Sequence, residues 1–106
     1  MDKREDKASE RRTEFRYPAD SPVGVSLRQP GWDQPLEGRL TDISVQGLRI
    51  VTSRYCLRGT LVEVHYGSLT IVAEVRHCKS LGTFEYALGL KIKEVTDTAT
   101  GTSTRL

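Results

Sequence analysis

Two short groups of residues in this sequence carry side chains suited to binding a phosphorylated, planar ligand. The first is the arginine pair Arg12 and Arg16, and the second is an Asp-x-Ser-x-x-Gly group formed by Asp42, Ser44 and Gly47. An arginine fork can bind a phosphate or a base edge through two hydrogen bonds, a geometry that lysine cannot reproduce. The carboxylate of Asp42 accepts hydrogen bonds, whereas the hydroxyl of Ser44 can donate or accept them. Gly47 can adopt a positive φ without steric cost, and we expect the tight turn to need that conformation.

Each group also has a purely structural interpretation. The arginine pair could belong to a solvated segment that pairs with Glu10 and Glu14, because exposed ion pairs of this kind are common and weak. The same spacing recurs at Arg54 and Arg58, so the pair alone is a weak signal. The acidic and hydroxyl side chains of the second group could instead cap their own turn. The second pattern is the rarer one, and the order of the two groups along the chain strengthens the functional interpretation.

The charge distribution separates a central domain from two polar ends. The chain has 106 residues, with 16 Lys+Arg against 14 Asp+Glu. Its formal net charge of +2 is too small for a protein that holds nucleic acid or a membrane surface by bulk charge. Residues 1–20 hold six basic and six acidic side chains and cannot bury enough surface to become ordered alone. We therefore expect a flexible charged arm over residues 1–10, one domain over residues 11–95 and a disordered polar tail over residues 96–106.

Apolar residues alternate with polar ones along six segments of the central domain, a period that is typical of half-buried strands. No apolar stripe persists at helical spacing over three turns. Because a small sheet protects its edges best by closing on itself, the pattern predicts an all-β protein, a small six-stranded antiparallel β-barrel. The six segments are residues 23–27, 36–40, 48–50, 62–66, 69–75 and 84–92.

With both motifs in place, the sequence resembles the PilZ family of bacterial cytosolic receptors for the second messenger cyclic di-GMP. The resemblance rests first on the arginine pair and the Asp-x-Ser-x-x-Gly group. It continues through residues 38–48, which are similar to the family's second and third strands, and residues 86–92, which are similar to its closing strand. It covers about residues 11–94 and implies a six-stranded β-barrel.

The resemblance also implies a ligand site. Arg12 and Arg16 would grip the guanine and phosphate groups of cyclic di-GMP. Asp42 and Ser44 would contact a guanine edge, while Gly47 would shape the turn. Binding would order the arginine arm over the barrel, and the signal would pass to an unidentified downstream protein.

Two further arginines are candidates for the same site. Arg11 directly precedes the first motif arginine, a position that in the family bears on ligand stoichiometry. A second cation there favours two stacked ligand molecules, which carry four phosphates between them. Arg49 alternates with the apolar Leu48 and Ile50, so it should point outward near the turn and contact the ligand.

Other classes of function find less support in the residues. A PilZ-like protein–protein adaptor that does not bind nucleotide remains the alternative, although this sequence keeps the ligand motifs. No catalytic triad, phosphate loop or acid/base pair is visible, so we expect neither an enzyme nor a cofactor. His65 and His77 lie in separate predicted strands, and the neighbouring Cys78 should point away from His77, so we expect no metal site. Cys56 and Cys78 should be free thiols.

The expected setting of the protein follows from the same observations. The N-terminal residues lack the apolar stretch of a secretory signal, and no apolar run is long enough for a transmembrane helix. We therefore expect a cytoplasmic protein that neither inserts into a membrane nor binds nucleic acid. We expect a monomer or a weak dimer.

Overall fold

The computed structural model describes residues 17–28 and 35–106 of the chain. The predicted flexible arm over residues 1–10 lies outside these residues, as do the candidate ligand-binding residues Arg11, Arg12 and Arg16. The other four candidates, Asp42, Ser44, Gly47 and Arg49, lie within them.

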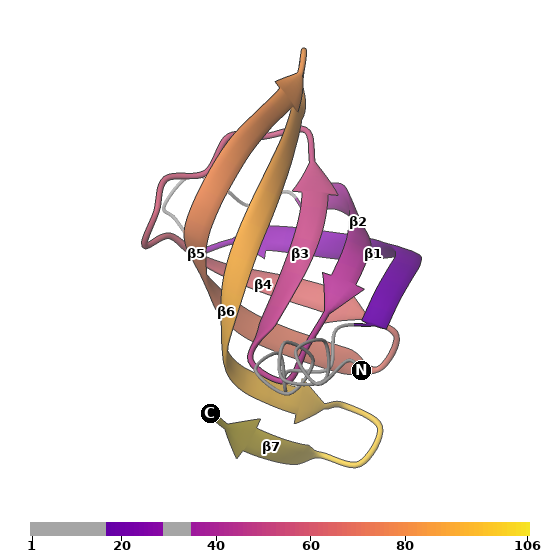
Figure 1. The fold of residues 1–106 in the computed structure, drawn as a ribbon. Helices are drawn as coiled ribbons and strands as arrows, with labels where there is room; N and C mark the ends of the chain where they lie inside the picture. The colour runs from indigo at the N-terminus through magenta and orange to yellow at the C-terminus, as the bar shows by residue number, and fades with distance from the viewer. Residues whose placement is uncertain (1–16, 29–34) are drawn as a thin grey trace, which may run out of the picture.

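The described residues form a closed barrel of six antiparallel strands with a seventh strand added outside it (Figure 1). Around the barrel the strands follow the order β3-β2-β1-β4-β5-β6, and β6 pairs back with β3 to close the sheet. The predicted all-β, six-stranded antiparallel barrel is therefore confirmed. The strands are β1 (Tyr17–Leu27), β2 (Leu36–Ile43), β3 (Gly47–Thr52), β4 (Leu61–Tyr66), β5 (Leu69–Gly82), β6 (Glu85–Asp97) and β7 (Thr102–Arg105).

The period-two alternation of the sequence explains why the sheet closes. Alternate residues of the six barrel strands point to the interior and exclude water, while their neighbours face outward. Side chains such as Ile50, Val62 and Leu88 are almost completely buried, and each contributes about 1.5–3 kcal/mol relative to an exposed position. The interior is formed by Val23, Val25, Leu27, Leu40, Leu48, Ile50, Cys56, Val62, Val64, Ile71, Ala73, Val75, Leu88, Leu90 and Ile92.

One wall of the barrel places β3 beside the hairpin of β6 and β5, which lies well after it in the sequence. Figure 1 shows β3, β6 and β5 side by side, with the turn between β2 and β3 at the lower end of this wall. The β3–β6 pairing joins Gly47 to Lys91 at one end and Thr52 to Tyr86 at the other. Barrel closure therefore brings the Asp-x-Ser-x-x-Gly turn against strands that follow it by about forty residues.

The C-terminal segment differs from the sequence-based expectation. Residues 96–106 were expected to form a disordered polar tail, but β6 continues to Asp97 and β7 pairs antiparallel with it over Glu94 to Asp97. The connection uses Gly101, whose φ of 77° is easily reached by glycine, and the Gly101 N–H donates to the Asp97 carbonyl at 2.7 Å. Apolar patterning missed this strand because β7 is exposed throughout and is held by backbone pairing. Across residues 17–28 and 35–106, no helix has the length and apolarity needed to cross a membrane.

Candidate ligand-binding site

The turn between β2 and β3 is closed by hydrogen bonds between Ser44 and Gly47. The Ser44 N–H donates to the Gly47 carbonyl at 2.8 Å. The Ser44 hydroxyl lies 3.2 Å from the Gly47 nitrogen, which donates to it, and 3.3 Å from the Gly47 carbonyl oxygen. Ser44 therefore has the turn-capping role that its residue type favours.

Gly47 has a different physical role from the one expected from the sequence. The described glycines with positive φ are Gly59, Gly67 and Gly101, and Gly47 is not among them. The expectation that the turn needs a positive φ at Gly47 is therefore wrong. A Cβ at this position would lie 2.8 Å from the Leu90 carbonyl oxygen of β6, closer than side chains normally approach. Gly47 is needed because β6 approaches the backbone of β3 closely at this point.

Asp42 and Arg49 extend the site along the outer surface of β2 and β3. They are register partners, and the Asp42 Oδ2 and Arg49 Nη1 atoms lie 4.0 Å apart. The side chain of Arg49 is 56% exposed, whereas its neighbours Leu48 and Ile50 are buried, so the predicted outward orientation of Arg49 is confirmed. With the Arg49 side chain exposed and the two charges 4.0 Å apart, this ion pair contributes at most about 1 kcal/mol, so the guanidinium can turn toward a ligand at small cost.

A cavity of about 370 Å³ lies beside this turn and reaches across β3, β6 and β5. It brings the four described candidate residues together with several that the sequence analysis did not identify. Its cationic side chains outnumber its single carboxylate by three to one, with Arg49, Arg76 and Lys91 against Asp42. Such a surface attracts anionic ligands. The lining residues are Asp42, Ser44, Gln46, Gly47, Leu48, Arg49, Arg76, His77, Gly89, Leu90 and Lys91.

Arg76 and His77 reach the cavity through an irregularity in β5. The register with β6 shifts between Val75 and His77, which leaves Arg76 as an extra residue on β5. Such a bulge changes the direction of nearby side chains and is common beside functional sites. Nothing in the local sequence identifies these residues, because their position depends on the pairing of β5 with β6.

The predicted motif arginines, Arg12 and Arg16, lie outside the described residues. The strand that follows them is described. Tyr17, the first residue of β1, pairs with Ile43, and Pro18 pairs with Asp42. β1 therefore begins at the end of β2 that carries Asp42.

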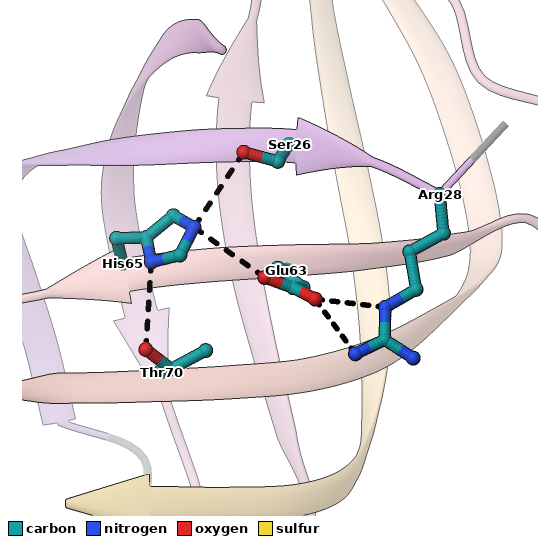
Figure 2. Close-up of polar contacts among 5 residues, drawn as sticks. All are labelled: Ser26, Arg28, Glu63, His65 and Thr70. Carbon is teal, nitrogen blue, oxygen red and sulfur yellow. Dashed lines mark hydrogen bonds and ion pairs between the residues drawn. The ribbon is translucent and has the colours of Figure 1, made fainter. Parts of the chain in front are cut away.

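The other histidine, His65, belongs to a separate cluster on the outer surface of β1, β4 and β5 (Figure 2). His65 lies 3.5 Å from the hydroxyls of both Ser26 and Thr70 and 3.7 Å from Glu63. Arg28 donates two hydrogen bonds to Glu63, at 2.6 and 2.8 Å. The polar side chains of this cluster are paired with one another, so the cluster is explained without a ligand. None of these residues lines the cavity.

Within the described parts of the chain, no group of three or more His, Cys, Asp or Glu side chains is placed to hold a metal ion. Cys56 and Cys78 are free thiols. Burial, followed by the proximity of Cys78, raises the pKa of the Cys56 thiol from 9.0 to about 11. Cys56 therefore stays protonated near neutral pH and is a poor nucleophile.

Comparison with known proteins agrees with this architecture. The sequence has no significant match among curated proteins. A sequence model of the PilZ domain matches residues 10–105, nearly the whole chain, and so spans both motifs, the barrel and β7. The chain therefore belongs to the PilZ domain family.

Proposed function

We propose that this protein is a receptor for cyclic di-GMP that passes the signal to a protein partner. The PilZ family is one of cyclic di-GMP receptors and adaptors, and its domains bind ligands or partners rather than catalyse reactions. The observation that carries the proposal for this chain is the cavity beside the β2–β3 turn, where Asp42, Ser44, Gly47 and Arg49 meet an excess of positive charge.

The chemistry of the cavity matches that of the ligand. Cyclic di-GMP presents two phosphates and two guanine bases. Arg49, Arg76 and Lys91 provide positive charge for the phosphates, and an arginine fork can also bind guanine O6 and N7 together. The Asp42 carboxylate can accept hydrogen bonds from the N–H groups on the Watson–Crick edge of guanine. Arg12 and Arg16 would complete the site, as the motif resemblance implies.

The proposal includes a mechanism for output. The arginine motif precedes β1, and β1 pairs with the end of β2 that carries Asp42. A ligand held by both motifs would restrict the N-terminal segment against the barrel and so change the surface that a partner meets. Output of this kind acts through contact with a partner, which we expect to be a cytoplasmic protein.

Calorimetric titration with cyclic di-GMP tests the proposal. Wild-type protein should bind saturably, and the molar ratio reports whether one ligand or two occupy the site. Arg16→Ala and Asp42→Asn should each lower the affinity roughly 5- to 150-fold, the loss expected for one good guanine contact. GMP, which has a single base and a single phosphate, should bind much more weakly.

Arg58→Ala is the matched control for charge. Arg58 shares the four-residue arginine spacing with Arg54 but is exposed outside the cavity, so its removal should leave the affinity unchanged. If the folded wild-type protein gives no saturable heat with cyclic di-GMP, the receptor proposal is wrong. A PilZ-like adaptor that contacts protein partners without binding nucleotide would then be the remaining function.

A further inference from the structure

Four residues form a continuous row across the outer surface of the barrel wall. Asp42 of β2 is the register partner of Arg49 of β3, Arg49 is the partner of Gly89 of β6, and Gly89 is the partner of His77 of β5. Directly opposed residues of antiparallel strands project from the same face of a sheet. All four residues line the cavity.

The row is interrupted at its centre, because Gly89 has no side chain. On one side stands the exposed guanidinium of Arg49, and on the other the exposed imidazole of His77. A Cβ built on Gly89 would lie 3.3 Å from Cδ2 and 3.8 Å from Cγ of His77, so the imidazole leans over the glycine. The result is a hollow with a backbone floor, one planar side chain on each side and a carboxylate at the end of the row.

The width of this hollow suits one planar ring system. Neighbouring strands are about 4.8 Å apart, so the backbones of β3 and β5 are separated by roughly 10 Å on either side of β6. Stacked rings have centroids about 4.5–7 Å apart, so a base between two planar side chains needs roughly 9 Å. The bulge at Arg76 sets the register that places His77, rather than a neighbouring residue, opposite Gly89.

We propose that the hollow over Gly89 seats one guanine base of the ligand, stacked on the imidazole of His77 and flanked by Arg49. This inference rests on the proposed function and assigns to His77 a contact that neither sequence motif contains. Base–aromatic stacking supplies affinity through the face of the ring and does not require a charge on it. The neighbouring Arg49 fork can then reach guanine O6 and N7.

Titrations of full-length variants with cyclic di-GMP test this seat. His77→Ala removes the stacking face and should lower the affinity roughly 5- to 150-fold. His77→Phe keeps a planar face without nitrogen atoms and should retain affinity close to that of the wild type. Gly89→Ala adds a methyl group to the floor of the hollow and should weaken binding. The new Cβ would lie 3.3 Å from Cδ2 of His77, an exposed side chain that can move, so the variant should still fold. His65→Ala removes the other imidazole, which belongs to the cluster in Figure 2 and does not line the cavity, and should bind like the wild type.

A second readout on the wild-type protein does not depend on any substitution. In NMR spectra of the complex, a guanine H8 proton should show nuclear Overhauser contacts to the His77 ring and an upfield ring-current shift. If the wild type binds and Asp42→Asn weakens binding, but His77→Ala and Gly89→Ala bind normally, the seat is wrong and the receptor function stands. If His77→Ala and His77→Phe lose affinity for cyclic di-GMP equally and the Overhauser contacts are absent, His77 makes a polar contact rather than a stacking contact. That result would also overturn the proposed guanine position. Absence of wild-type binding overturns both proposals.

Discussion

Substitution of Gly47 by alanine would place a methyl group in the contact between β3 and β6. The new Cβ would lie 2.8 Å from the Leu90 carbonyl oxygen, whereas ordinary contacts are 3.4–4 Å. The Leu90 oxygen is a backbone atom and the alanine Cβ is bonded directly to the backbone, so neither can rotate away, and the strands must separate by about half an ångström to relieve the overlap. This movement strains the hydrogen bond from the Ile92 N–H to the Gln46 carbonyl, now 2.9 Å long, and those that close the turn.

The expected cost follows from these contacts. Overpacking typically destabilises by about 1–3 kcal/mol. The reduced freedom of the unfolded chain offsets about 0.4–1 kcal/mol of this, because alanine has fewer unfolded conformations than glycine. The net loss should be about 1–2 kcal/mol, which corresponds to a fall in Tm of roughly 4–16 °C for a domain of this size.

Thermal and denaturant unfolding followed by circular dichroism would measure the effect, with Gly24→Ala as the matched control. Gly24 also lies within a strand, but its Cβ would only reach the Cβ of His65 at 3.7 Å, an ordinary contact. Gly24→Ala should therefore be neutral or slightly stabilising. The reasoning is refuted if Gly47→Ala unfolds at the wild-type temperature, or if the two variants are destabilised equally.

Three further predictions follow from the same structure. Burial raises the pKa of the folded Cys56 thiol to about 11, so the free energy of unfolding should fall by about 2 kcal/mol between pH 9 and 11, because the thiol ionises more readily in the unfolded chain. Denaturant titrations across that range should show this slope in the wild type, and the slope should be shallower in Cys56→Ala. Ser44→Ala removes the hydroxyl contacts to Gly47 and should lower the free energy of unfolding, measured by denaturant titration, by about 1 kcal/mol. It should also weaken cyclic di-GMP binding. An unchanged free energy of unfolding would contradict the role of Ser44 in the turn. Deletion of residues 98–106 removes β7, which is exposed and, among the described strands, pairs with β6 alone, so the barrel should still unfold cooperatively in a thermal melt. Loss of the cooperative transition would show that β7 is essential.

Much of the fold could be predicted from the sequence because its signals are local. Period-two alternation depends on neighbouring residues alone, so it identified the six barrel strands and the outward orientation of Arg49. β7 escaped the same reasoning, since a polar strand held by backbone pairing has no apolar pattern. The Asp-x-Ser-x-x-Gly group marked the turn correctly for a similar reason, because Ser44 and Gly47 contact each other across only three residues.

The wider site depends on closure of the barrel, which no local pattern encodes. Gly89 and His77 join Arg49 only because β6 pairs with β3 on one side and with β5 on the other. A bulge of one residue at Arg76 decides which β5 side chain stands opposite Gly89, since a shift of one position reverses the face that each side chain occupies. The need for glycine at position 47 is likewise set by the approach of the Leu90 carbonyl from β6. Residue types and short spacings thus determined the strands and the turn, whereas long-range register determined which side chains share the cavity.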